Sequence, residues 1–186
     1  MAKIFLFRHG QTTYNRDGIL TGWEDPDLTD NGIKECLEIA KQLKDEIPTK
    51  AYASDLKRSQ HTLSLALGDK KNKITIVIDP RIKERDYGDL NGRNKENVKK
   101  EYPEKYPLWH RSYDVPPPNG ESIKDVEKRV NAFLDDLVAK LDSNDVVFIS
   151  AHGNSLRPIR RYFEKMSIEE MCSFEHTPAK VYEYIV

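Results

Sequence analysis

Apolar and polar positions alternate along the chain in blocks that predict strands and helices in turn. A continuously apolar run covers Ile4 to Phe7 and stops at Arg8 and His9. A short run of this kind is typical of a strand buried on both faces, as in the parallel core of an α/β sheet. A second run, Val146 to Ala151, has the same form and stops at His152. We therefore expect two buried strands, each followed directly by a histidine and a glycine.

Apolar residues spaced three and four apart predict helices between the strands. One helix is expected from about Thr29 to Glu46, with Ile33, Leu37, Ala40 and Leu43 on its buried face. Another is expected from Ser122 to about Leu141, where Ser122 and Asp125 resemble a capping box. The other expected elements are a strand at 51–54, a helix capped by Ser54 or Asp55 and running to about Leu67, a third buried strand at 74–78, helices after Asn154 and from Ser167, and a last strand at 181–186. Strands that alternate with helices predict a three-layer α/β sandwich with a mostly parallel central sheet.

The length of 186 residues predicts a single domain, 1–186. Residues 81–120 interrupt the alternation, because they are polar and aromatic and end in three consecutive prolines, Pro116 to Pro118. Connections this long inside a compact domain usually serve a function. We expect this stretch to be an excursion that carries short helices over the strand ends and covers a site.

Composition excludes several classes of function. The 30 Lys and Arg nearly balance the 31 Asp and Glu, for a formal charge of −1, so no global positive field holds a nucleic acid. The first apolar run is too short for a signal peptide or a membrane helix. Cys36 and Cys172 lie in segments with helical patterning and are expected as buried, reduced thiols. We expect a cytoplasmic protein without nucleic-acid or membrane partners.

The polar residues at the strand ends are the candidates for chemistry. Carboxyl ends of parallel strands share one edge of a sheet, where such sheets bind ligands, so His9 and His152 should meet there. Arg58 lies in the first turn of the helix after the 51–54 strand, where free amides and a guanidinium attract phosphate or carboxylate. The alternative for Arg58 is a surface salt bridge. A carboxylate held near phosphate has a raised pKa and serves as a proton donor. The residues alone do not separate Glu84 from Glu24, Asp86 or Asp89 in that role.

Rival chemistries have weaker support. None of the five histidines has helix-facing ligand spacing, and nearby arginines disfavour a zinc ion. The stretch from Gly153 to Arg157 resembles the start of a serine nucleophile elbow but lacks its second glycine. Neither a Walker loop nor a dinucleotide glycine fingerprint is present. A nucleophilic histidine with phosphate-binding arginines is therefore the favoured interpretation, since neutral imidazole can attack phosphorus.

The stretch from Arg8 to Thr12, with Asn15, resembles the signature of the histidine phosphatase superfamily. Along nearly its full length the chain resembles the cofactor-dependent phosphoglycerate mutases. The matching stretches are 20–23, 54–58, 84–88, 90–95, 111–118 and 151–157. The Glu-Arg-x-Tyr-Gly pattern from Glu84 and the following Asn94-Lys95 are more specific than Arg-His-Gly, which indicates only the superfamily.

The resemblance implies a role for each matching residue. His9 would be phosphorylated, and Glu84 would act as acid and base toward the substrate oxygen. The remaining roles fall into three groups: Arg8, Arg58 and His152 would hold the phosphoryl group; Asn15, Gly153 and Asn154 would complete its cradle; and Thr21, Gly22, Tyr87, Lys95 and Arg111 would hold the carboxylate and second phosphate of a small phosphorylated substrate. The resemblance also implies 2,3-bisphosphoglycerate as the primer of His9, without a metal.

Three departures from the family pattern bear on the activity. His110 stands where the family has a first of two adjacent arginines, and at its ordinary pKa near 6.5 it would be a weaker, pH-dependent anchor. An insertion after Pro118 and a tail after Val186 are missing. The expected function is interconversion of 3- and 2-phosphoglycerate in glycolysis and gluconeogenesis. The alternatives are a broad-range phosphomonoesterase with the same phosphohistidine and, from another class, a module that binds phosphorylated ligands. The sequence leaves open whether the protein forms a homo-oligomer.

Overall fold

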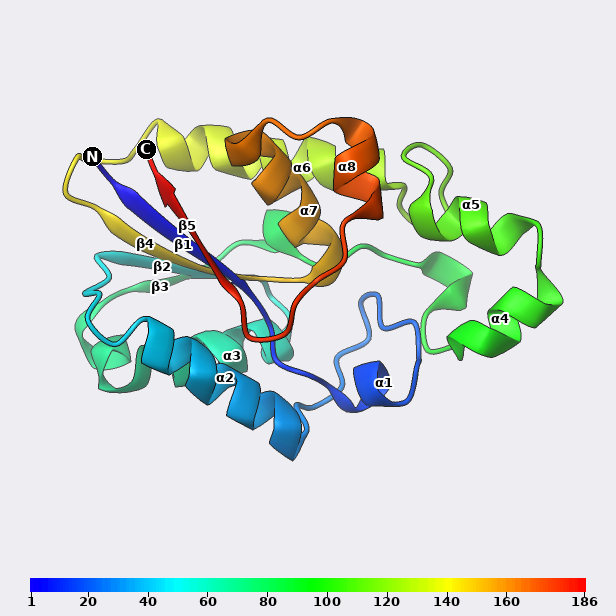
Figure 1. Ribbon diagram of the computed structural model, residues 1–186, viewed down its shortest axis with the longest axis horizontal. Helices are drawn as coiled ribbons and strands as arrows, with labels where there is room; N and C mark the ends of the chain where they lie inside the picture. Colours follow the sequence, from blue (N-terminus) through cyan, green and yellow to red (C-terminus); the bar gives the residue numbers. More distant parts are fainter.

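A five-stranded sheet in the order β3-β2-β4-β1-β5 runs through the middle of the computed structural model, which describes residues 1–186 (Figure 1). The strands are β1 (Lys3–Arg8), β2 (Lys50–Ala53), β3 (Ile76–Ile78), β4 (Val146–Ala151) and β5 (Val181–Ile185). All neighbours are parallel except β5, which pairs antiparallel with β1. The predicted fold class, an α/β sandwich with a mostly parallel sheet, is confirmed.

Helices cover both faces of the sheet. The helices are α1 (Thr13–Arg16), α2 (Asp30–Gln42), α3 (Lys57–Leu67), α4 (Lys95–Glu101), α5 (Lys105–Arg111), α6 (Ile123–Val138), α7 (Gly153–Glu164) and α8 (Ile168–Ser173), with single 3₁₀ turns η1 (Gly68–Lys73), η2 (Pro80–Ile82) and η3 (Gly88–Leu90). Helices α2 and α3 lie on one face, and α6 and α7 lie on the other (Figure 1). This arrangement gives the three predicted layers.

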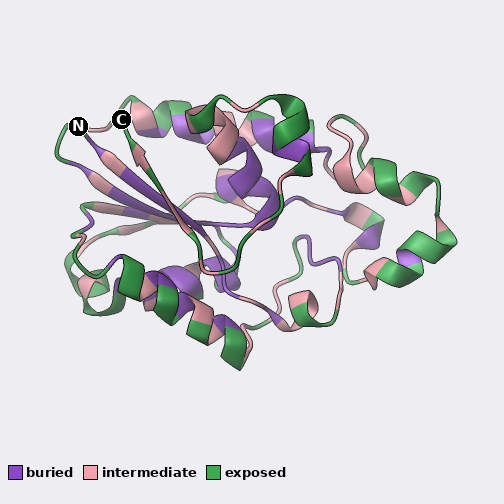
Figure 2. Cartoon of the chain, viewed as in Figure 1, coloured by how far each residue is buried: buried purple, intermediate pink, exposed green.

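Strand β1 is buried from both sides because its side chains alternate between two cores. Ile4 and Leu6 pack into the core under α6 and α7, whereas Phe5 and Phe7 pack into the core under α2 and α3. Its neighbour β4 alternates in the same way, and both central strands are buried along their length (Figure 2). The interpretation of these two apolar runs as strands buried on both faces is confirmed.

The N-terminal caps of α6 and α8 are those that the sequence predicts. The Ser122 hydroxyl accepts the Asp125 N–H, and the Asp125 carboxylate accepts the Ser122 N–H, which makes the expected capping box. Ser167 and Glu170 form the same arrangement before α8. These caps satisfy amides that have no partner within the helix, so they set where each helix begins.

The predicted buried face of α2 is only partly right. Leu43 packs into the core as expected, but the helix buries Gly32, Cys36 and Ile39, whereas Leu37 is 47% exposed. The reason is a close approach of two backbones, since a Cβ on Gly32 would lie 2.1 Å from the Gln11 carbonyl oxygen. Only glycine permits that contact, and the contact turns this side of the helix inward. The helix also ends at Gln42 rather than near Glu46.

The prediction of a third buried strand is also wrong. Strand β3 covers only Ile76–Ile78 and lies at the edge of the sheet, next to β2 alone. Val77 and Ile78 are 40% and 44% exposed. A run of β-branched residues does not distinguish an edge strand from a central one, because the number of neighbours is set by the whole sheet.

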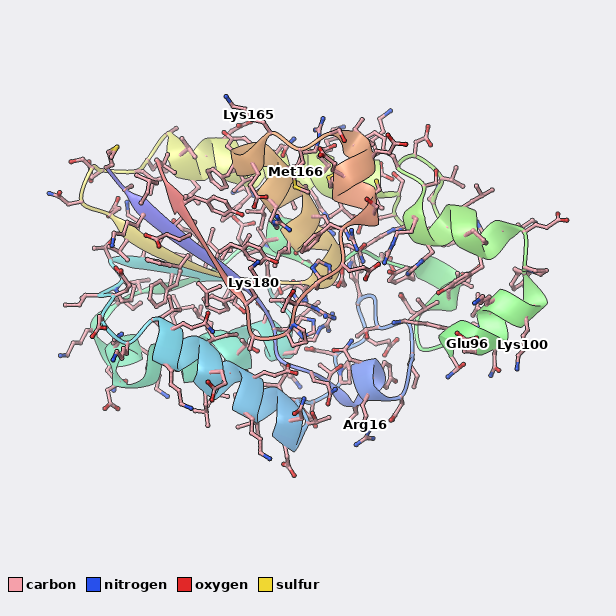
Figure 3. The ribbon with its side chains drawn as sticks, in the orientation of Figure 1. Arg16, Glu96, Lys100, Lys165, Met166 and Lys180 are labelled. Carbon is pink, nitrogen blue, oxygen red and sulfur yellow. The ribbon has the colours of Figure 1, made fainter.

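Residues 81–120 hold η2, η3, α4 and α5, which extend the molecule beyond the carboxyl ends of the central strands (Figure 1). On α4, Glu96 and Lys100 project outward (Figure 3), whereas Lys95 is partly buried and lines a cavity. Short helices in this stretch agree with the expectation. No helix of the chain combines the length and the apolar character that crossing a lipid bilayer requires.

Candidate active site

The two histidines that end β1 and β4 meet. The strands are hydrogen-bonded neighbours with Arg8 opposite Ala151, so His9 and His152 follow side by side. Their ring centroids are 5.0 Å apart, and the residues are only 5% and 0% exposed. The expectation that parallel strands deliver both imidazoles to one place is confirmed.

His9 is held in one tautomer. Its Nδ1 lies 2.8 Å from the carbonyl oxygen of Gly10. A carbonyl only accepts, so Nδ1 carries the hydrogen and Nε2 keeps a free lone pair. Burial, followed by the charges of Arg58 and Arg8, keeps the pKa of His9 well below its ordinary value. At neutral pH the ring is therefore an uncharged imidazole with an available nucleophilic nitrogen.

The Gly10 peptide that fixes this tautomer is held from two sides. Its N–H donates to Thr62 Oγ1 on α3 (3.1 Å). A Cβ on Gly10 would lie 2.4 Å from the Gly32 carbonyl oxygen on α2. Both helices therefore touch the backbone that orients His9.

Glu84 completes a buried cluster with the two histidines. One nitrogen or oxygen atom of each side chain lies within 4.8 Å of the others. Glu84 Oε1 accepts the N–H groups of Arg85 (2.7 Å) and Asn154 (3.0 Å), which fixes the carboxylate. Two histidines and a carboxylate resemble a metal site, but the guanidinium groups that depress the pKa of His9 create a positive potential that disfavours a cation. The cluster is better suited to an anion.

Arg58 is buried, so the alternative of a surface salt bridge is wrong. Its guanidinium donates to the carbonyl oxygens of Glu24 (2.6 Å) and Gly22 (2.9 Å) and lies 3.4 Å from the carboxylate of Asp25. These bonds tie the loop of residues 22–25 to the start of α3. Arg58 therefore lies close to His9 but does not line the cavity.

The predicted cap of α3 is wrong. Neither Ser54 nor Asp55 caps the helix, since Asp55 pairs with Lys83 and the Ser54 hydroxyl accepts only the N–H of Leu56, which precedes the first turn. Asp25 instead accepts the Lys57 N–H at 2.7 Å. A carboxylate at this terminus is favoured by the helix dipole. The cap comes from a distant loop, which local sequence does not reveal.

A cavity of about 170 Å³ opens beside the cluster. Its walls include ten of the predicted site residues: Arg8, Asn15, Thr21, Gly22, Glu84, Tyr87, Lys95, Arg111, Gly153 and Asn154. The other three, His9, Arg58 and His152, are buried next to it. The structure thus brings the predicted residues together, while their roles stay predictions.

Four cationic side chains line this cavity: Arg8, Lys95, Arg111 and Arg157. Burial, then the charges of Arg8 and Arg111, lowers the pKa of Lys95. Burial and Arg111 lower the pKa of Arg157 to about 10. Arg8 Nε and Arg157 Nε are buried without a partner in the chain. Clustered cations and unpartnered donors make a strong site for an anion with several charges.

The sequence model of the histidine phosphatase superfamily (branch 1) matches residues 4–185. The chain belongs to the histidine phosphatase superfamily. The resemblance found in the sequence is confirmed. The 2,3-bisphosphoglycerate-dependent phosphoglycerate mutase of Bradyrhizobium diazoefficiens is 42% identical over 177 residues, which cover 92% of this chain and 86% of that protein. The enzyme of the same name from Rhizobium johnstonii is 42% identical over 173 residues, which cover 89% and 81%.

Two solved phosphatase structures share the fold. A putative α-ribazole-5'-P phosphatase from Escherichia coli is 26% identical, with a TM-score of 0.86 over 98% of this chain and 89% of that one. A mycobacterial glucosyl-3-phosphoglycerate phosphatase in complex with VO3 is 23% identical, with a TM-score of 0.87 over 97% and 91%. At that identity the second likeness shows the fold alone.

Three charged or titratable cavity residues carry no role in the sequence-based prediction: Arg157, Glu175 and His176. Arg111 pairs with Glu175 at 2.7 Å. His176 has a pKa lowered to about 2 by burial and by Arg8 and Arg157. Glu175 and His176 lie in an irregular segment after α8 that carries no motif. Arg157 had a signal, since it ends the matching stretch 151–157.

The expected half-charged state of His110 near pH 6.5 is wrong. Burial, then Arg111 and Lys95, lowers its pKa to about 4. The ring stacks on Tyr106, with centroids 5.3 Å apart and planes 13° apart. At neutral pH His110 is an uncharged wall of the cavity and supplies no cation in place of the family's arginine.

Proposed function

We propose that this member of the histidine phosphatase superfamily is a 2,3-bisphosphoglycerate-dependent phosphoglycerate mutase. It interconverts 3- and 2-phosphoglycerate through a phosphohistidine on His9, as part of glycolysis and gluconeogenesis in the cytoplasm. The observation that carries the proposal is the neutral His9 beside a cavity lined by four cationic side chains, Arg8, Lys95, Arg111 and Arg157. The names of relatives at about 40% identity support the same activity.

In the proposed reaction the free hydroxyl of bound 3-phosphoglycerate first attacks the phosphorus of primed phospho-His9: the oxygen–phosphorus bond forms, the bond from phosphorus to His9 Nε2 breaks, and Glu84 takes the hydroxyl proton. After the resulting bisphosphate turns in the site, His9 Nε2 attacks its other phosphorus. A bond forms from nitrogen to phosphorus, the bond from phosphorus to the substrate oxygen breaks, and protonated Glu84 gives its proton to that oxygen. Arg8, Arg58 and His152 offset the negative charge of the phosphoryl oxygens. This second transfer releases 2-phosphoglycerate and leaves His9 phosphorylated for the next molecule of 3-phosphoglycerate.

The other residues that line the cavity suit the rest of the substrate. Lys95 and Arg111, with Thr21, Gly22 and Tyr87, would hold a carboxylate and a second phosphate. Asn15 and the start of α7 at Gly153 and Asn154 would close around the transferring group. A molecule with several charges must stay bound while it turns between two transfers, and fixed anchors at both ends allow that.

The same residues fit 2,3-bisphosphoglycerate. The buried, unpartnered Nε atoms of Arg8 and Arg157 lie on walls that also carry Lys95 and Arg111, a donor set that matches two phosphates and a carboxylate. When bound, this molecule would supply the phosphoryl group that primes His9. The proposed mechanism assigns no step to a metal ion.

A phosphomonoesterase with the same phosphohistidine is the second candidate. One observation favours it, because Glu175 pairs with Arg111 and so offsets one of the four cations that line the cavity. The structural likeness to a phosphatase at 26% identity points the same way. In that reaction water, rather than a second hydroxyl of the bound molecule, would attack the phosphohistidine.

Product analysis decides between the two. The enzyme is incubated with 3-phosphoglycerate, with and without 2,3-bisphosphoglycerate, and the products are identified by phosphorus NMR. We expect 2-phosphoglycerate to form only when the bisphosphate is present. Labelled bisphosphoglycerate should leave an acid-labile phosphoenzyme that His9→Ala does not form and that the exposed control His61→Ala does form. Phosphate release from simple monoesters faster than isomerisation would replace the mutase by the phosphatase. Label on the His9→Ala protein would remove His9 as the nucleophile.

A further inference from the structure

The Ser54 hydroxyl contacts the second histidine of the cluster from behind. Ser54 directly follows β2 and begins the connection to α3, and its Oγ lies 2.7 Å from His152 Nε2. Both residues are completely buried. The same Oγ accepts the N–H of Leu56 at 3.2 Å. No role for Ser54 is part of the function proposed above.

The hydrogens of this contact fit together in one way. A serine hydroxyl has one hydrogen to donate, and Oγ already accepts from Leu56. If Ser54 donates to His152 Nε2, every hydrogen at this contact has an acceptor. If Nε2 carried a hydrogen instead, Oγ would accept twice and its own hydrogen would be buried without an acceptor. An unsatisfied buried donor costs about 1–3 kcal/mol. The contact therefore favours an imidazole whose hydrogen is on Nδ1.

The ring nitrogen of His152 that does not contact Ser54 is Nδ1. His152 Nδ1 is buried and completes no hydrogen bond within the chain, although the His152 side chain lies at the N-terminus of α7, facing the Ser155 N–H. The ring lies against His9 and shares the cluster with Glu84. Burial, followed by the charges of Arg58 and Arg8, lowers the pKa of His152 well below its ordinary value, so the ring has one hydrogen to place rather than two.

We propose that Ser54 is a positioning residue that keeps the hydrogen of His152 on Nδ1, so that this ring donates to the transferring phosphoryl group. The inference rests on the phosphohistidine reaction proposed above and deepens it. His9 and His152 then share one tautomer but face the reaction with opposite ends. His9, bound to Gly10 through Nδ1–H, presents a lone pair, and His152, bound to Ser54 through Nε2, presents an N–H.

The opposite tautomer of His152 would oppose the reaction. A lone pair on Nδ1 would face phosphoryl oxygens that also carry lone pairs, so an attraction would become a repulsion. Partners that orient a functional imidazole from its far side typically affect metal affinity or activity about 10–100-fold. We expect an effect of that size for Ser54, although its side chain does not line the cavity.

Nitrogen NMR tests the tautomer without any substrate. A two-bond proton–nitrogen correlation spectrum of the ¹⁵N-labelled full chain, with His152→Gln to assign the signals, should show His152 protonated on Nδ1. In Ser54→Ala the hydrogen should move in part or wholly to Nε2. Protonation of Nε2 in the unaltered protein, or an unchanged tautomer in Ser54→Ala, would overturn the proposal. Neither outcome depends on whether the enzyme is a mutase.

Binding of inorganic vanadate supplies the functional readout, since its five-coordinate form resembles a transferring phosphoryl group. Ser54→Ala should bind vanadate about 10–100-fold more weakly. Ser150→Ala is the matched control, because Ser150 is equally buried and its hydroxyl donates only to the Ser59 carbonyl. If Ser54→Ala and Ser150→Ala lost vanadate affinity equally, Ser54 would have only a structural role and the proposal would be wrong. If the NMR spectrum showed His152 protonated on Nδ1 but the product analysis found no bisphosphate-dependent isomerisation, the mutase proposal would fail and the role of Ser54 would stand.

Discussion

The buried histidines predict a steep loss of stability on mild acidification. His9, His152 and His176 have pKa values lowered by burial among cations, and His110 follows with a pKa of about 4. A histidine whose pKa is lower in the folded than in the unfolded protein binds its proton first in the unfolded chain. The contribution to stability is therefore present above the unfolded pKa of about 6.5 and is lost as the pH falls below it.

The size of the loss follows from that difference in protonation. One histidine that stays neutral when folded and has a pKa of about 6.5 when unfolded changes the unfolding free energy by about 1.4 kcal/mol between pH 7.5 and 5.5. The two deeply buried rings of His9 and His152 give about 3 kcal/mol together, and the half-buried His176 and His110 each add at most about 1 kcal/mol. Domains of this kind are stable by about 5–15 kcal/mol, so the loss takes away a large share.

Urea unfolding followed by circular dichroism at pH 7.5, 6.5 and 5.5 measures this change. The window stops at pH 5.5 so that carboxylates, including Asp145 with a pKa lowered to about 2, stay ionised. His110→Gln should reduce the loss by at most about 1 kcal/mol. The exposed His61, replaced in the same way, serves as control. An unfolding free energy that is constant over this range, or that rises as the pH falls, would refute the reasoning.

Four other variants test the site. Glu84→Gln keeps the shape but removes the transferable proton, so turnover should fall about 10²–10⁴-fold while vanadate affinity changes less than about threefold. Turnover within about threefold of the unaltered enzyme would move the acid–base role elsewhere. Lys95→Ala and Arg111→Ala each remove a charge-assisted contact worth about 1.5–3 kcal/mol and should raise KM for phosphoglycerate about 10–100-fold, unlike the outward-facing control Lys100→Ala. Arg58→Ala frees the loop of residues 22–25 and should lower the unfolding free energy by about 2–4 kcal/mol as well as slowing phosphorylation. Full stability with slower phosphorylation would mean that Arg58 acts on phosphate alone.

The parts of the fold that depend on local pattern could be predicted from the sequence. The apolar runs before His9 and His152 identify the two central strands, and Ser122 with Asp125 identifies the start of α6. The proximity of His9 and His152 could be predicted as well, because parallel strands end at the same edge of a sheet. In each case one short stretch holds both the pattern and its physical cause.

The parts that depend on distant contacts could not be predicted. The buried face of α2 is set by the backbone of Gln11, and the cap of α3 is set by Asp25. Either contact joins segments more than twenty residues apart and leaves no pattern in either one. The position of His176 in the cavity wall is of the same kind, since an irregular segment carries it there. The pKa of His110 depends on burial and on cations that only the folded chain brings together.

The glycine contact between the loop after β1 and α2 has a consequence for mutational sensitivity. A Cβ on Gly10 would meet the Gly32 carbonyl at 2.4 Å and the sulfur of Cys36 at 2.9 Å, and the Gly10 carbonyl orients His9. Any substitution that shifts α2 outward therefore moves the peptide that aims the nucleophile. Enlarging Cys36, a residue that never meets substrate, should lower turnover as an active-site change does, so a map of harmful substitutions would extend along the inner face of α2 well beyond the cavity.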